Sequence, residues 1–142
     1  MPKKVKADAL ANEIMSLLQQ YANDVTSDMK KDIDSVARAT VKKIKEKAPV
    51  RKDSKKKKYE PGSYRDSWRS TLQNENSYRK SRIVYAGGHQ YSLTHLLENG
   101  HRVVLKGRNA GNAPAKVHIR PAEEWASNEL EQRTIKRIKE NS

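Results

Sequence analysis

The chain has 142 residues, of which 35% are apolar and 33% are charged, with no cysteine and no phenylalanine. The lack of cysteine excludes disulfides, thiolate metal sites and cysteine catalysis. The 30 Lys and Arg outnumber the 17 Asp and Glu, which gives a net charge of +13. Such an excess attracts polyanions, with nucleic acid as the first candidate and acidic protein surfaces as the second.

The length fits a single domain over residues 1–142. The apolar content is low for a compact monomer, so we expect an elongated subunit that completes its core against copies of itself. No stretch approaches the ~18 apolar residues of a membrane span, and the basic N-terminus is followed by no continuous apolar region. We therefore expect a soluble protein that binds no membrane.

Residues 1–48 carry apolar side chains at the spacing of a helix. The members of this series are Leu10, Ile14, Leu17, Tyr21, Val25, Met29, Ile33, Val36, Val41 and Ile44. Steps of three to five residues place them on one face, and no Gly or Pro interrupts residues 3–47. A single helix of about 40 residues would be roughly 60 Å long, so part of it must project or pack on a neighbour. Because Thr26 or Ser27 could cap a second helix, two helices are the alternative.

Residues 49–63 are predicted to form a basic, flexible loop. Pro49 ends the preceding helix, because the residue before a proline is disfavoured in the α conformation. The loop holds four consecutive lysines, Lys55, Lys56, Lys57 and Lys58. Lysines neutralise phosphates without reading sequence, and Tyr59 and Tyr64 could stack on bases. The alternative is a solvated, charged loop.

Residues 64–120 are predicted to form a small antiparallel sheet with a short helix inserted at 91–98. Strands are expected at 64–72, 82–86, 101–105 and 116–120, with a turn at 74–76 and a flexible loop at 106–114. In the short helix, Leu93, Leu96 and Leu97 should face inward.

One residue of the last predicted strand is a histidine. His118 alternates with Val117 and Ile119 and should point away from their face.

Residues 121–140 are predicted to form a C-terminal helix. Pro121 suits its first position, where a missing N–H costs nothing. Glu123 and Glu124 in the first turn and Lys139 in the last complement the helix dipole. The whole pattern predicts an α+β fold, with a long N-terminal helix, a small antiparallel sheet with a short helix inserted, and a C-terminal helix packed on the sheet.

The sequence offers no catalytic constellation. The histidines at 89, 95, 101 and 118 match no zinc spacing. Glu98 and the pair Glu123-Glu124 have ordinary structural roles at helix ends, and no Gly-x-Ser-x-Gly elbow, phosphate loop or dinucleotide fingerprint is present. We therefore expect no enzyme, no metal and no cofactor, with a small metal-dependent nuclease as the weakest alternative. No motif for sequence-specific nucleic-acid recognition occurs.

Two phrases stand out behind the basic helix: Leu97-Glu98-Asn99-Gly100 preceded by Tyr91, and the run Val117–Ala122, which contains Arg120-Pro121. Together with the helix stop at Ala48-Pro49-Val50, their order resembles the HK97 gene-product-ten family of long-tailed bacteriophages. These are tail-completion or head-to-tail joining proteins related to minor tail protein Z. The resemblance extends over about residues 7–138. The family's motif positions fall on Pro49, Gly62, Ser67, Tyr91, Leu97, Glu98, Gly100, Arg120 and Pro121.

The chain departs from the family pattern in two places. A lysine-rich insertion precedes Gly62. The family motif that corresponds to Val117–Ala122 begins with a proline, which is absent here, although Pro114 lies nearby. The insertion leaves the length and role of the lysine loop open.

The resemblance implies a structural protein of the virion neck, at the head-proximal end of the tail, assembled in the host cytoplasm. Its partners would be copies of itself in a ring, a hexamer, the head-completion or connector proteins, and the tail tube or tail terminator protein. Genomic DNA would pass through the lumen. The candidate polyanion contacts are Lys55, Lys56, Lys57, Lys58, Lys106 and Arg108. The alternative function, from charge alone, is sequence-independent nucleic-acid binding.

Overall fold

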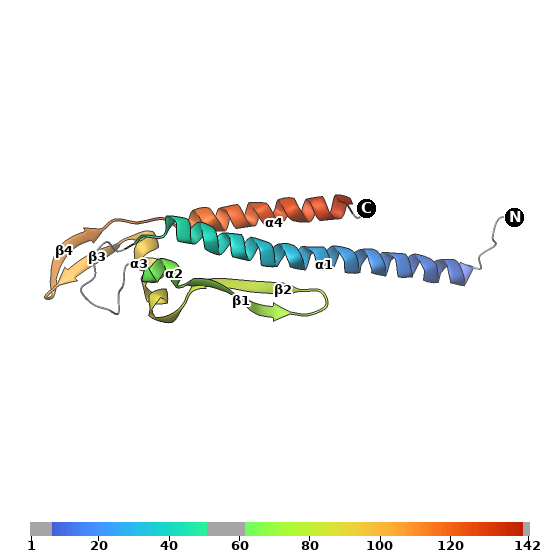
Figure 1. Ribbon diagram of the computed structural model, residues 1–142, viewed down its shortest axis with the longest axis horizontal. Helices are drawn as coiled ribbons and strands as arrows, with labels where there is room; N and C mark the ends of the chain where they lie inside the picture. The colour runs from blue at the N-terminus through green and yellow to red at the C-terminus, as the bar shows by residue number, and fades with distance from the viewer. Residues whose placement is uncertain (1–6, 51–61, 141–142) are drawn as a thin grey trace.

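A long helix forms the axis of the subunit, and the other elements pack around its C-terminal half (Figure 1). The computed structural model describes residues 7–50 and 62–140. Helix α1 spans Ala7–Lys47 without a break. The prediction of one continuous helix is therefore confirmed over the two-helix alternative. At ~1.5 Å per residue, α1 is roughly 60 Å long.

The elements after α1 give the chain its α+β class, as predicted. They are α2 (Ser63–Asp66), β1 (Trp68–Glu75), β2 (Lys80–Ala86), the 3₁₀ helix η2 (Gly88–Leu93), α3 (Thr94–Asn99), β3 (His101–Leu105), β4 (Arg108–Ala113) and α4 (Arg120–Glu140). The strands form two separate antiparallel hairpins, β1 with β2 and β3 with β4. The expected single sheet is thus divided into two.

The first hairpin runs along α1 (Figure 1). Its register pairs Trp68 with Ala86 and Glu75 with Lys80. The strand predicted at 64–72 begins only at Trp68, because Gly62 takes a left-handed conformation with φ of 82° and starts the helical turn α2. This turn carries Tyr64 into the core. The strand predicted at 82–86 is confirmed within β2.

The second hairpin corrects the prediction of a flexible loop at 106–114. Strand β3, which was predicted, pairs with β4 through a two-residue turn in which Lys106 and Gly107 have φ of 52° and 74°. Positive φ at both positions is typical of a type I′ hairpin turn. The sequence of β4, Arg-Asn-Ala-Gly-Asn-Ala, has weak strand propensity. Its pairing with β3 makes it a strand.

The segment predicted as the last strand, 116–120, has no ladder partner among the residues described. Its N–H groups at His118, Ile119 and Arg120 bond instead to the carboxylate of Glu98. Backbone donors that are satisfied by a side chain cannot also serve a sheet.

The C-terminal helix is confirmed, but its packing differs from the prediction. Helix α4 lies along α1, on the side of α1 opposite to the β1–β2 hairpin (Figure 1), and not on the sheet. Polar pairs contribute to this contact, because Arg137 bonds to both carboxylate oxygens of Asp32 on α1, at 3.1 and 3.2 Å. Helix α1 already packs along the β1–β2 hairpin, and α4 packs on α1 instead.

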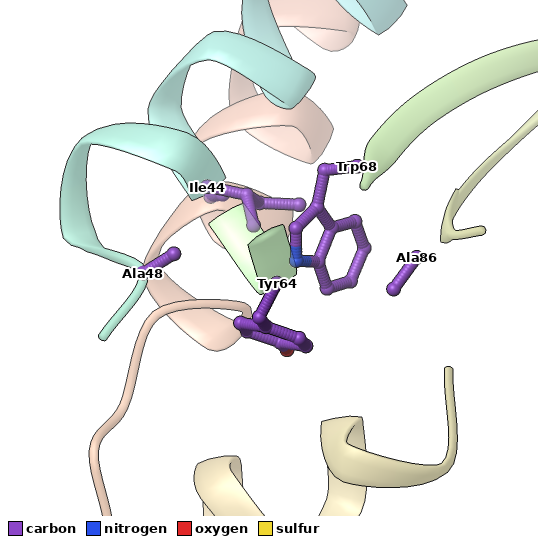
Figure 2. Close-up of a cluster of buried hydrophobic side chains, with 6 residues drawn as sticks. Ile44, Ala48, Tyr64, Trp68 and Ala86 are labelled. Atoms are coloured by element: carbon purple, nitrogen blue, oxygen red, sulfur yellow. The ribbon is translucent and has the colours of Figure 1, made fainter. Parts of the chain in front are cut away.

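The core lies at the C-terminal end of α1 and is small. Its buried members are Ile44, Ala48, Tyr64, Trp68, Ala86 and Ala122. Figure 2 shows Ile44 on the last turn of α1 and Ala48 just after its end, near the rings of Trp68 and Tyr64. Leu93 and Leu97 pack against this cluster as predicted, whereas Leu96 is 42% exposed and does not face inward.

Candidate functional site

Glu98, in the last turn of α3, fixes the start of α4. Its carboxylate accepts hydrogen bonds from the backbone N–H groups of His118 at 2.8 Å, Ile119 at 3.0 Å and Arg120 at 2.9 Å. The first N–H groups of a helix have no partner within the helix, and its N-terminus favours negative charge. Glu98 therefore acts as the N-terminal cap of α4, although it belongs to a different helix.

The charge of Glu98 is stabilised by the same contacts. Burial raises the pKa of its carboxyl, but the three N–H donors and the neighbouring His118 lower the pKa by more, so it lies below its usual range. The group is ionised at neutral pH, and its contribution to α4 depends on that charge.

His118 connects this cap to α2. The side chain is completely buried, and its Nδ1 lies 2.7 Å from the carbonyl oxygen of Lys116 and 3.0 Å from Oε2 of Glu98. Because both neighbours are acceptors, Nδ1 carries the proton. Nε2 lies 2.7 Å from the Tyr64 hydroxyl, and in the tautomer with its proton on Nδ1 it accepts a hydrogen bond from that hydroxyl. Glu98, His118 and Tyr64 form one hydrogen-bonded chain.

The rings in this chain also pack against Trp68. Tyr64, Trp68 and His118 meet edge to face, with centroids 5.5 to 6.2 Å apart and planes 76 to 84° apart. Such pairs add to the stabilisation that burial gives. Burial also raises the pKa of Tyr64, which keeps the phenol protonated as a donor. We call the four residues Tyr64, Trp68, His118 and Glu98 the latch.

The latch overturns one expectation and refines another. Tyr64 is only 6% exposed, so it cannot stack on bases, while Tyr59 lies outside the described residues. His118 points away from the side of Val117, as predicted. However, His118 is the buried residue of the two and Val117 is the exposed one. Ile119 packs against the core as the chain turns into α4.

Other family positions surround the latch. Ser67 donates its hydroxyl to the carbonyl of Tyr64 at 2.6 Å and thereby closes α2. Gly100 has φ of 76°, and an added Cβ would lie 2.7 Å from the carbonyl oxygen of Ala113. Pro49, Gly62 and Leu97 line one hollow beside Tyr64. These positions therefore serve the junction of α1, α2, α3 and α4.

Tyr91 is the exception among the family positions. It is 68% exposed and lies on the edge of an open groove of about 670 Å³. We call it the α1–β2–α4 groove: α1 forms its floor, β2 and α4 form its walls, and η2 and α3 close one end. Its lining includes Ile33, Val36, Val84, Tyr91, Ala126 and Leu130. Sequence periodicity could not reveal it, because its lining comes from six elements that are far apart in the sequence.

The candidate polyanion contacts are only partly placed. Lys106 and Arg108 are exposed on either side of Gly107, in the β3–β4 hairpin at the opposite end of the molecule from the start of α1 (Figure 1). The lysines at 55–58 lie outside the described residues.

The latch has a structural role. His118 is completely buried, and both of its ring nitrogens lie within hydrogen-bond distance of protein groups. Within residues 7–50 and 62–140, no three His, Asp or Glu side chains are grouped to hold a metal ion. In the same part of the chain, no helix combines the length and apolarity that a bilayer span needs.

Charge is distributed unevenly along the chain. Residues 7–29 contain no Lys or Arg and four acidic residues, Asp8, Glu13, Asp24 and Asp28. Of the 30 Lys and Arg, three precede residue 7, which leaves 27 after residue 29, against 13 of the 17 Asp and Glu. The first half of α1 is thus acidic on an otherwise basic protein.

The family model described as "Bacteriophage HK97-gp10, putative tail-component" matches residues 7–100. The match covers α1 to α3 with Tyr64 and Glu98, while His118 and α4 lie beyond it. No curated protein and no solved structure matches the chain. The match extends over most of the chain and confirms the resemblance, so the chain belongs to the HK97-gp10-like family of bacteriophage tail components and has a structural role.

Proposed function

We propose that this protein completes the head-proximal end of the tail of a long-tailed bacteriophage and joins the tail to the head. Copies of the chain form a ring, a hexamer, around the channel through which genomic DNA passes. The observation that carries the proposal is the first part of α1, which lacks packing partners within the described part of its own subunit.

This part of α1 is exposed on all sides. Every side chain from residue 8 to residue 20 is exposed, and α1 extends past the end of α4 and past the β1–β2 hairpin (Figure 1). Four apolar residues share one face there. Leu10 is 49% exposed, Ile14 48%, Leu17 61% and Leu18 58%. We call these four residues the free stripe.

Exposure of the free stripe to water is energetically unfavourable in a monomer. Contiguous apolar surface on a soluble protein marks an interaction site. Isolated helices shorter than ~12–15 residues are marginal in water, so most helical stability comes from packing an amphipathic face. Assembly with copies of the chain supplies the missing contacts, and closed rings are a common form of homo-oligomer.

The charge supports a position around DNA. A net charge of +13 creates a field that favours a polyanion, and backbone contacts need no sequence readout. The exposed pair Lys106 and Arg108 offers such contacts on a hairpin. By the resemblance, the ring meets the head-completion or connector proteins on one face and the tail tube or tail terminator on the other. It acts in the virion neck after assembly in the host cytoplasm, and we propose no catalytic role.

A phage in which this gene is disrupted tests the proposal. We expect separate filled heads and unjoined tails in lysates viewed by electron microscopy, and we expect purified protein to restore joining when added to them. Normally joined virions from the disrupted phage would refute the assignment.

Sequence-independent nucleic-acid binding remains the second candidate, favoured by the lysines at 55–58 and the total charge. It predicts duplex binding by the isolated protein, with a steep salt dependence that becomes shallower when these lysines are replaced by alanine. Absence of binding at low salt would eliminate it.

A further inference from the structure

The free stripe and the α1–β2–α4 groove are two unfilled apolar surfaces on one chain. We propose that the free stripe of each copy lies in the groove of the next copy, so that the subunits join head to tail. The inference rests on the proposed ring and identifies the surfaces that close it.

The two surfaces of one subunit cannot meet. The stripe is centred near residue 14 of α1 and the groove near residue 38, which are roughly 36 Å apart at ~1.5 Å per residue. Helix α1 is continuous between them, and no Gly or Pro between residues 7 and 47 provides a hinge. The stripe can therefore enter only the groove of another copy.

The groove suits an apolar helix face. Val84 on β2 and Leu130 on α4 are half-buried and line its walls. Tyr91 is 68% exposed at its closed end, and tyrosine is among the residues that most often dominate binding energy at interfaces. A volume of about 670 Å³ admits several aliphatic side chains.

Charge complementarity selects the occupant. The wall formed by β2 carries Lys80 and Arg82, which both bind the carboxylate of Asp34. Lys80 and Lys30 also lie within 3.9 Å of the carboxylate of Glu75, so this cluster holds one more cation than acids. The free stripe is flanked by Asp8 and Glu13, with no cation between residues 7 and 29, although three lysines precede them in the sequence. An acidic helix is therefore favoured beside the β2 wall.

The opposite wall holds an acid. Glu123 on α4 also lines the groove, so the edge of the incoming stripe that carries Glu13 should face β2 and not α4. This fixes one orientation of the stripe in the groove.

The contact has a definite symmetry. Stripe and groove are different surfaces, so the joint is heterologous and each copy uses both surfaces, which produces a closed ring if the rotation between copies closes. Stripe against stripe would instead give an isologous dimer.

Mixing two variants, each with one of the two surfaces disrupted, distinguishes the heterologous contact from the isologous dimer. In the stripe variant, Ile14→Asp and Leu17→Asp place charges on the exposed face of α1. In the groove variant, Ala126→Glu adds a like charge to the groove, and Tyr91→Asp, at a position that is 68% exposed, is a second form that leaves the core intact. Circular dichroism checks that each variant folds.

Native mass spectrometry reads the outcome. Each variant alone should be a monomer, whose mass differs from the 16.2 kDa of the natural chain only by the substitutions. An equimolar mixture should give one-to-one dimers, because only the intact stripe of the groove variant and the intact groove of the stripe variant can still pair. Rings from either groove variant alone, or a mixture without dimers, would overturn the inference.

Cysteine pairs locate the contact directly, because the natural chain has no cysteine. A chain with Ile14→Cys and Tyr91→Cys should form disulfide-linked oligomers, whereas the control pair Ser16→Cys and Tyr91→Cys, with position 16 on the opposite face of α1, should not. Equal crosslinking of both pairs in assembled rings would reject the joint and leave the ring standing. If the unmodified chain forms no rings, alone or with tails, the proposed function itself fails.

Discussion

Removing the carboxylate of Glu98 should detach α4 from the rest of the junction. Each hydrogen bond to a charged acceptor contributes ~1.5–3 kcal/mol, and an unsatisfied buried donor costs ~1–3 kcal/mol. The N–H groups of His118 and Ile119 are part-buried, whereas that of Arg120 is exposed to water. We therefore expect Glu98→Ala to lower the free energy of unfolding by about 3–5 kcal/mol, out of a total of roughly 5–15 kcal/mol for a domain.

Glu98→Gln should lower the free energy of unfolding by an intermediate amount. The amide keeps one acceptor oxygen but turns its NH₂ group toward one backbone donor. We expect a loss of about 1–3 kcal/mol, between the wild type and Glu98→Ala.

Urea unfolding followed by tryptophan fluorescence measures both losses. Trp68 lies against the ring of His118, with centroids 6.2 Å apart, so its emission reports on the latch. Trp125 is replaced by Phe in every protein, because its ring lies 4.6 Å from the ammonium of Lys43 on a different surface. The matched control is Glu124→Ala, an exposed acid just after the first turn of α4, which should change stability by no more than about 0.5 kcal/mol. Equal losses for Glu98→Ala and the control would refute the cap.

Acid should remove the same contribution. The pKa of Glu98 is below its ordinary value, so its stabilisation is complete above that ordinary value and disappears as the pH falls through the lowered pKa. The difference in unfolding free energy between the wild type and Glu98→Gln should therefore narrow between pH 6 and pH 3 (about three units across the carboxyl range). A difference that does not change with pH would contradict the assignment of charge to this site.

Two further substitutions probe the neighbouring packing. Gly100→Ala combines a strained positive φ with a clash against the carbonyl of Ala113, so the thermal midpoint should fall by an amount equivalent to about 1–3 kcal/mol; an unchanged midpoint would show that the turn can relax. The hydrogen bond from Lys80, together with Arg82, holds the pKa of Asp34 below its usual range, and its ion pairs stabilise the β1–β2 hairpin only above that lowered pKa. Asp34→Asn should cost about 1 kcal/mol in low salt and less in high salt, and an effect independent of salt would argue against ion pairing.

Much of the fold could be predicted because its signals are local. An apolar residue every three to five positions from Leu10 to Ile44, without Gly or Pro, is sufficient for α1. Pro121 and its acidic neighbours marked α4 to within one residue. The strand β4 was missed because its residues have weak strand propensity, and only pairing with β3 through the Lys106-Gly107 turn makes it a strand.

The candidate site was only partly accessible from the sequence. Glu98 and Arg120 could be selected by resemblance, but their contact spans 22 positions, and nothing in either segment encodes it. The burial of His118 could not be predicted, because strand alternation was applied to a segment that forms no strand. Its partner Tyr64 is 54 positions away, so its burial is a tertiary property.

Cryo-electron microscopy of the intact virion tests the central claim most directly. We predict a closed ring of this chain at the junction of head and tail, with DNA in its lumen and Leu10, Ile14, Leu17 and Leu18 covered by the neighbouring subunit. The account is contradicted if the chain is absent from the neck, or if it is present there with the first half of α1 in solvent.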